Sequence, residues 1–284
     1  MPYTMAKPLT WKLLKANLYF ILGLLLIIVT LTAAAQPQLT FSHSIPVSSA
    51  TAISEDQNGN IYLLDTKQNL LRLDSLGKPL DTFSPPTRGR ITSISAWNSM
   101  KVLLFYQDRQ ELLLLDRFLR PIGTTRLLDL DYLNTVRAAT LASDEGFWLF
   151  NETNFSLDKL DLRLGKITSE TPLNLILERE RFDVRMVREY QNMIYLLDFN
   201  NGIYVFDNLG NYKSKLPFTG VSYINFRKNE LYFVKQDKLI FHQLYTSQQR
   251  EILLPADKKY TSGLVSDRNI YLFSAKKLDV YTLE

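Results

Sequence analysis

Short apolar segments recur along this chain at an interval of about 40 residues. The letters IYLLD occur twice, and related segments complete a series of six. The six segments begin at Ile61, Val102, Phe147, Ile194, Leu231 and Ile270. A segment of small and β-branched residues precedes each of them and a second alternating segment follows, which predicts short β-strands. A period near 40 with four short strands per unit is typical of a β-propeller.

The two ends of the repeat region predict how such a ring closes. The sixth unit stops at Glu284, directly after its third strand at Leu278–Leu283. A strand-like segment with no partner of its own, Gln38–Ile45, precedes the first unit. Pairing the two segments would remove an exposed sheet edge. We therefore predict an all-β fold for residues 36–284, a six-bladed β-propeller closed by an N-terminal strand that completes the last blade.

One stretch carries a family resemblance. Ile53–Lys78, which reads ISEDQNGNIYLLDTKQNLLRLDSLGK, resembles a blade of the NHL and TolB-like six-bladed β-propellers, whose blades carry a D-x-x-G-N-I-Y-V-x-D pattern. The pattern is clear in the first and fourth units, whereas Lys235–Glu251 in the fifth lacks both the Asp and the Gly turn. The resemblance implies a fold and no particular activity, because propellers host many functions.

The first 35 residues predict export. Three lysines, Lys7, Lys12 and Lys15, precede the apolar run Leu18–Leu31, and three alanines end at Ala35. These are the parts of a secretory signal peptide, and the Ala-Gln junction resembles that of small exported Bacteroidota proteins. We expect a periplasmic, outer-membrane-associated or secreted protein. The alternative is an uncleaved anchor, because the apolar stretch is at the lower limit for crossing a bilayer.

Charge and cysteine content exclude several classes of partner. The leader holds three lysines and no acid, so its removal lowers the formal net charge from +4 to +1. A nearly neutral domain has no basic stripe for phosphates, and we expect no nucleic-acid partner. The absence of cysteine excludes disulfides, thiolate metal sites and a lipid anchor on cysteine. We expect no cofactor.

The predicted inner strands are poor in metal ligands. Only Asp183 and Asn225 offer oxygens that a calcium ion would accept, and calcium requires six or more ligands. A calcium-dependent lactonase-like hydrolase at the channel mouth, a function known among propellers that resemble this one, is therefore an alternative of lower rank. Arg90, Arg137 and Arg185 would either line one mouth of the channel and attract an anion or pair with acids between the blades.

Two long connections suggest a docking site for a protein. The surplus residues of the longest units lie in Gly123–Arg137 and Thr171–Arg185, which both join an outer strand to the next inner strand. An apolar patch bordered by charge is typical of protein interfaces. The candidate partner-binding residues are Leu127, Leu128, Leu130, Tyr132, Leu133, Leu173, Leu175, Ile176, Leu177 and Phe182. The competing interpretation is that these leucines alternate inward as part of ordinary outer strands.

These observations favour a non-catalytic protein-interaction scaffold in the cell envelope over an enzyme. The specific form that we consider is a periplasmic subunit of an outer-membrane protein assembly or secretion complex, whose partner is another envelope protein. A third candidate is a small-molecule or glycan-binding propeller. It ranks last because most aromatic residues recur at one strand position, as Tyr62 and Tyr195 do, which indicates packing between sheets.

Overall fold

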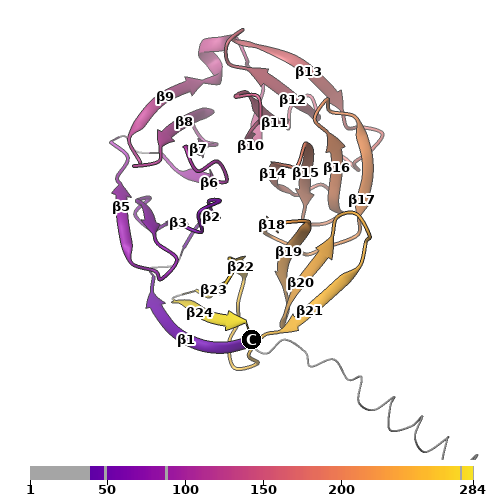
Figure 1. The fold of residues 1–284 in the computed structure, drawn as a ribbon. Coiled ribbons are helices and arrows are strands. Elements are labelled where there is room, and N and C mark those ends of the chain that lie inside the picture. The colour runs from indigo at the N-terminus through magenta and orange to yellow at the C-terminus, as the bar shows by residue number, and fades with distance from the viewer. Residues whose placement is uncertain (1–38, 48–49, 87–88, 276, 284) are drawn as a thin grey trace, which may run out of the picture. The chain divides into compact units, whose positions relative to one another are not determined.

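The computed structural model describes residues 39–47, 50–86, 89–275 and 277–283. These residues form six antiparallel sheets of four strands, arranged as blades around a central axis (Figure 1). Blades one to three comprise β2 (Ile53–Glu55), β3 (Ile61–Leu64), β4 (Leu70–Leu73), β5 (Pro79–Phe83), β6 (Ile91–Ser95), β7 (Lys101–Tyr106), β8 (Glu111–Asp116), β9 (Pro121–Arg126), β10 (Val136–Leu141), β11 (Phe147–Asn151), β12 (Ser156–Asp161) and β13 (Lys166–Pro172). Blades four to six comprise β14 (Val184–Tyr190), β15 (Met193–Asp198), β16 (Gly202–Asp207), β17 (Tyr212–Leu216), β18 (Asn225–Arg227), β19 (Glu230–Lys235), β20 (Lys238–Gln243), β21 (Gln249–Leu253), β22 (Ser262–Val265), β23 (Asn269–Phe273), β24 (Lys277–Leu283) and β1 (Leu39–Pro46).

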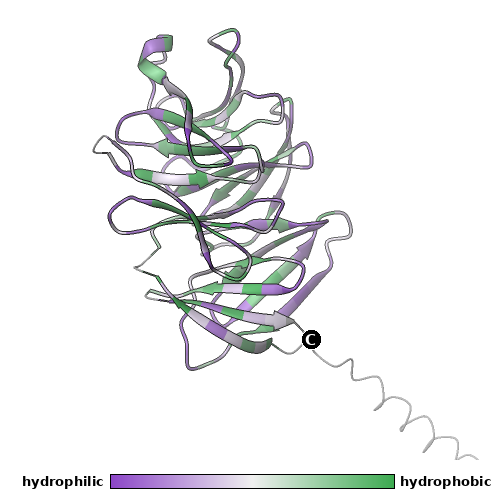
Figure 2. Ribbon diagram, turned by 60° about the vertical axis from the view of Figure 1, so that its left-hand side comes forward, coloured by the Kyte–Doolittle hydropathy of each residue, from purple (hydrophilic) through white to green (hydrophobic). Residues whose placement is uncertain are grey.

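The predicted six-bladed fold is confirmed, and the IYLLD segments are the second strands of blades one and four. All four residues of β3 are buried, because this strand lies between two neighbours in its sheet and between two adjacent blades. Tyr62, Tyr195, Tyr232 and Tyr271 occupy the same place in four blades and are all buried. Their recurrence therefore reflects packing between blades. Figure 2 shows the resulting concentration of apolar residues within the strands.

The ring closes where β1 pairs with β24, as the sequence predicts. The two strands are antiparallel, with Leu39 opposite Leu283 and Ile45 opposite Leu278. Asp279, buried in β24, fastens this pair to the rest of blade six: it accepts hydrogen bonds from Ser44 Oγ, Tyr260 Oη at 2.7 Å and Lys258 Nζ at 3.0 Å. Burial of Asp279 opposes ionisation, but these donors outweigh it and hold the pKa of its carboxyl below the ordinary value.

Aspartate-led turns connect the third and outer strands. In blade one, Asp74 Oδ1 accepts hydrogen bonds from the backbone N–H groups of Leu76 and Lys78, and Gly77 supplies the positive φ of 79°. In blade four Asp207 caps the equivalent turn. In these turns the aspartate carboxylate accepts the hydrogen bonds of the backbone N–H groups. The side chain at the tip of the turn, such as that of Leu76, points outward and is exposed.

The interpretation of the two long connections as continuations of outer strands is wrong. The outer strand β9 ends at Arg126, and Leu127–Leu130 form a 3-10 helix, η1, that ends at Asp131 in the left-handed conformation. The outer strand β13 ends at Pro172, and the chain then turns, with the N–H groups of Ile176 and Leu177 donating to Leu173 O. The first strand of blade five is short, because β18 spans only Asn225–Arg227.

The predicted signal peptide lies outside the described residues. The only helix in the described part of the chain is the four-residue η1, so this part contains no helix with the length and apolar composition that crossing a membrane requires.

Candidate functional site

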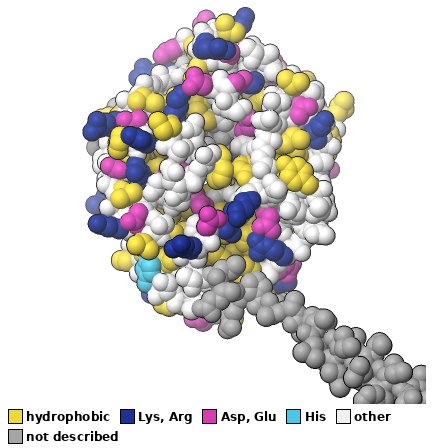
Figure 3. All heavy atoms as spheres, in the orientation of Figure 1, with side chains coloured by type: hydrophobic (Ala, Val, Ile, Leu, Met, Phe, Trp, Pro, Cys, Tyr) yellow, Lys and Arg dark blue, Asp and Glu magenta, His cyan; other side chains and the backbone are white. Residues whose placement is uncertain are grey.

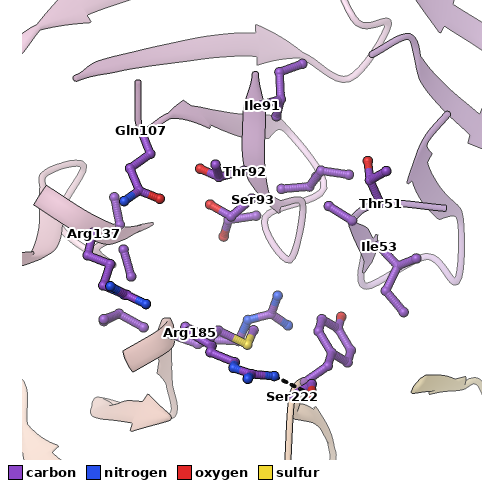
Figure 4. A pocket seen from close by; sticks show the side chains of 18 of the residues that line it. Thr51, Ile53, Ile91, Thr92, Ser93, Gln107, Arg137, Arg185 and Ser222 are labelled. Carbon is purple, nitrogen blue, oxygen red and sulfur yellow. Dashed lines mark hydrogen bonds between the residues drawn. The ribbon is translucent and has the colours of Figure 1, made fainter. Parts of the chain in front are cut away.

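The inner strands and the segments leading into them enclose a central cavity of about 470 Å³. All six blades contribute to its wall, which consists mainly of Ser, Thr, Ala and Ile side chains. Figure 4 shows Thr92 and Ser93 on one side of this cavity, Arg137 and Arg185 on another, and Thr51 and Ile53 on a third. A cavity of this size is within the range that small organic molecules occupy in proteins.

Repeated β-bulges place polar side chains on the wall of this cavity. In β6, β10 and β14 the pairing with the second strand skips one residue near the strand start, and the skipped residues are Thr92, Arg137 and Arg185. A bulge adds a residue that has no cross-strand partner and re-aims its side chain. The same irregularity in three consecutive blades therefore directs two arginines and a threonine to the channel.

Asp183 holds the two bulge arginines in place. Arg185 Nε and Nη2 donate to Asp183 Oδ2 at 3.0 and 2.8 Å, and Arg137 Nη2 donates to Asp183 Oδ1 at 3.1 Å. The Arg185 guanidinium in particular, together with Arg137, holds the pKa of Asp183 below its ordinary value. Arg137 also reaches Glu152 at 3.4 Å, and Arg185 donates to Ser222 at 2.8 Å. Arg137 and Arg185 therefore combine the two alternatives that the sequence leaves open, since both line the cavity and both pair with acids.

A further arginine, Arg188, lines the same cavity and is more deeply buried than Arg137 and Arg185. Arg188 of β14 is buried, with 2% of its surface exposed, and its Nη1 donates to Asn225 Oδ1 at 2.5 Å. Asn225 Nδ2 in turn faces Glu55 Oε2 at 3.4 Å, and the Tyr232 hydroxyl lies 3.3 Å from the same oxygen. Burial raises the pKa of Glu55 to about 8. Sequence reasoning missed Arg188 and Glu55.

These contacts bear directly on the calcium alternative. The two candidate ligands are both committed to arginines, Asp183 to Arg137 and Arg185, and Asn225 to Arg188. Guanidinium groups on these oxygens compete with any cation, so the residues present do not fit a calcium site. Among the described residues no group of three or more His, Asp or Glu side chains is arranged to hold a metal ion.

The ten candidate partner-binding residues do not form one exposed patch. Leu127, Leu173 and Leu177 are buried in the core, so a partner cannot reach them and their inclusion was wrong. Four residues are half-buried, namely Leu130, Tyr132, Ile176 and Phe182. Tyr132 is held in this position because its hydroxyl donates a hydrogen bond to the buried Asp158 at 2.6 Å. The three exposed ones are Leu128 at 67%, Leu133 at 79% and Leu175 at 101%.

The two long connections nevertheless contact the same turn. Both contact the β11–β12 turn of blade three: the N–H of Thr135 donates to Thr153 Oγ1 at 2.9 Å, and Arg179 Nη2 donates to Thr153 O at 3.1 Å. Figure 3 shows apolar side chains around the visible face in separate groups among charged ones.

Two further features were not predicted. Exposed apolar side chains occupy the third-to-outer-strand turns of several blades, among them Leu76, Phe118, Leu164 and Leu209. A second cavity of about 420 Å³ is lined by Trp97, Tyr190 and again Arg188, with the Trp97 and Tyr190 rings in edge contact at 5.2 Å. Trp148, by contrast, is wholly buried and unavailable for stacking on a ligand.

Comparisons with known proteins identify the class of fold. Neither the protein-family models nor the curated proteins include a match to this chain. Among solved structures, a virginiamycin B lyase from Staphylococcus aureus has a TM-score of 0.59 at 11% identity, over 88% of this chain and 100% of that one. A streptogramin B lyase has a TM-score of 0.57 at 14% identity, over 87% and 97%. The β-propeller domain of Cps50 (Swd1) from Myceliophteria thermophila has a TM-score of 0.60 at 10% identity, over 87% and 100%. At such low identity these similarities show that the chain is a β-propeller protein and nothing finer.

Proposed function

We propose that this propeller is a non-catalytic interaction scaffold of the cell envelope, which binds another envelope protein through the exposed leucines of its two long connections. The observation that carries the proposal is the exposure of Leu128, Leu133 and Leu175 on two connections that contact the same turn. We refer to these three residues as the rim leucines. Apolar side chains that lie exposed together on one surface, bordered by polar residues, are a recognised mark of interaction sites.

The rim leucines could supply a useful share of a binding energy. Complete burial of a leucine side chain is worth about 1.5–3 kcal/mol. Two of the three, once covered, would therefore change a dissociation constant by roughly a hundredfold or more, since about 1.4 kcal/mol corresponds to tenfold. Mixed charges near the leucines, such as Asp129, Asp131 and Arg181, would form a polar border that favours one orientation of the partner.

The location in the envelope rests on the leader sequence. A basic start, an apolar run and the alanines ending at Ala35 support export, and the lack of cysteine argues against a lipid anchor on this chain. A partner in or at the outer membrane would then hold the propeller there. A periplasmic subunit of an outer-membrane assembly or secretion complex is the form that we favour.

The test is a comparative purification from native membranes under gentle detergent. The wild-type chain should retain one protein in fixed ratio, and the Leu133→Asp/Leu175→Asp variant should lose it. The matched control is Leu76→Asp/Leu209→Asp, which removes two leucines of similar exposure from turns elsewhere on the ring. Circular dichroism establishes that all variants fold. Purification of the wild type as a lone monomer, or equal retention by all variants, would reject the scaffold.

A further inference from the structure

The buried Arg188 has hydrogen-bonding capacity that the described residues do not use. Its Nη1 is bound to Asn225, but its Nε and Nη2 are buried and have no hydrogen-bond partner. The hydroxyl of Tyr223 lines the same cavity within hydrogen-bonding range of Arg188, which opposes the rise of its pKa, but it has no partner of good geometry either. Buried donors without partners are rare in folded proteins and usually indicate a bound water or ligand.

The two unused nitrogens lie on the same edge of the guanidinium group. The Nε–H and the adjacent Nη2–H point in parallel, which is the geometry that accepts the two oxygens of a carboxylate or phosphate side by side. Single waters can satisfy each donor but cannot exploit this pairing. The arrangement therefore favours an oxyanion over a neutral ligand.

The charge of Arg188 also lacks a counterion in the described structure. No ion pair joins it to a carboxylate among the described residues: its Nη1 donates to Asn225, whose Nδ2 faces Glu55. Burial raises the pKa of the Glu55 carboxyl to about 8, so that this group is largely neutral at physiological pH. Burial of a charge without a counterion is strongly unfavourable. An anion bound at Arg188 would remove that cost.

The remainder of the cavity is suited to guiding an anion inward. Four arginines line it, Arg90, Arg137, Arg185 and Arg188, against the one carboxylate of Asp183 among its described lining residues. The exposed fraction of the side chain falls from 34% and 35% at Arg137 and Arg185 to a residue value of 2% at Arg188. The wall of the cavity also carries hydroxyl groups, such as those of Ser93 and Ser262, which can bind a polar ligand body.

We propose that the central cavity binds a small organic anion, whose carboxylate or phosphate group is held side-on by Nε and Nη2 of Arg188, with Arg137 and Arg185 at the entrance. None of the three rim leucines lines this cavity.

The experiment is isothermal titration calorimetry of the folded domain with inorganic phosphate and, separately, malonate, at constant ionic strength maintained by chloride. We expect saturable binding of one or both probes at one site per chain. Arg188→Met should abolish it, and Arg185→Gln should weaken it by roughly ten- to a hundredfold, because loss of a charged hydrogen bond costs about 1.5–3 kcal/mol. The control is Arg250→Gln, since Arg250 pairs with Glu230 on the outer part of blade five and does not line the cavity.

Each outcome decides the proposal. Binding of phosphate alone assigns the site to phosphorylated ligands, binding of malonate alone assigns it to carboxylates, and either supports the site. If Arg188→Met does not fold, the Arg185→Gln result stands as the test, because that side chain lies at the more open end of the cavity. Absence of saturable binding of both probes at millimolar concentration would overturn the proposal. So would binding that Arg188→Met or Arg185→Gln leaves unchanged, which would show an adventitious ion only.

Discussion

Substitution of Glu55 by glutamine tests the electrostatics of the channel. Glu55 is 5% exposed, faces Asn225 and Tyr232, and forms no ion pair with a basic residue in the described structure. Burial raises the pKa of its carboxyl from 4.5 to about 8. A protonated glutamic acid and a glutamine have nearly the same shape and both accept through a carbonyl oxygen. Glu55→Gln should therefore preserve the packing while removing the titration.

The sign and size of the effect follow from linkage. Because the folded state holds the proton more tightly than the unfolded state, the contribution of Glu55 is fully favourable below pH 4.5 and is lost as the pH rises toward 8. The interval from 4.5 to about 8 spans about 3.5 pH units, or roughly 4–5 kcal/mol at ~1.36 kcal/mol per unit. At pH 7 about 2.5 of these units are in effect, so Glu55→Gln should be more stable than the wild type by roughly 3 kcal/mol.

Urea denaturation of both proteins between pH 4.5 and 8 measures this difference. Other titrating groups change the two curves alike, so the difference between variant and wild type isolates Glu55. We expect near equality at pH 4.5 and a gap that widens steadily toward pH 8. If Glu55 is instead ionised and balances Arg188, the variant will be the less stable protein at pH 7. That result would refute both the neutral carboxyl and the uncompensated arginine.

Three other changes test the ring and its rim. Thr40→Cys/Thr282→Cys places two cysteines at register partners of β1 and β24 in a chain with no other cysteine. Oxidation should form a disulfide and raise the unfolding free energy by up to about 5 kcal/mol. The control is Thr40→Cys/Thr168→Cys, and equal cross-linking of that pair would argue against closure. Asp279→Asn should cost about 2–3 kcal/mol at pH 7 through weaker bonds to Lys258 and Tyr260. Its cost should shrink as the pH falls through the lowered pKa of Asp279, where the wild type loses the same interactions; a cost that stays constant in acid would contradict this role. Tyr132→Phe should destabilise the domain by about 1–2 kcal/mol, because the buried Asp158 loses a donor, and should leave partner retention unchanged if Tyr132 is a structural residue.

The architecture was predictable because it depends on features that repeat. Six apolar segments at a regular interval indicate six equivalent sheets, and an unpaired strand at each end of the series requires a partner. The pairing of Ile45 with Leu278 follows from that requirement. The Asp-Gly turns are equally visible, since their chemistry is local: Asp74 caps a turn whose positive φ is supplied by Gly77.

The channel and the rim depend on deviations from the repeat, and a sequence pattern does not show these. A bulge at Arg185 shifts the alternation of β14 by one residue, so that a period of two cannot place both Arg185 and Arg188 correctly. The signal available for Arg188 was weak, because β14 also contains the charged residues Arg185 and Glu189. On the rim, alternation suggested strands where the chain forms a 3-10 helix and a turn, which bury Leu127 and Leu173 and expose Leu128 and Leu175.

Site-specific photo-crosslinking in intact cells tests the proposed scaffold most directly. A photoreactive residue replaces Leu133 or Leu175 on the rim, and Leu209, a leucine of similar exposure in the turn before β17, is the control position. We expect positions 133 and 175 to form an adduct with the same envelope protein and position 209 to form none with it. Identical adducts from all three positions, or no adduct from either rim position, would contradict the scaffold.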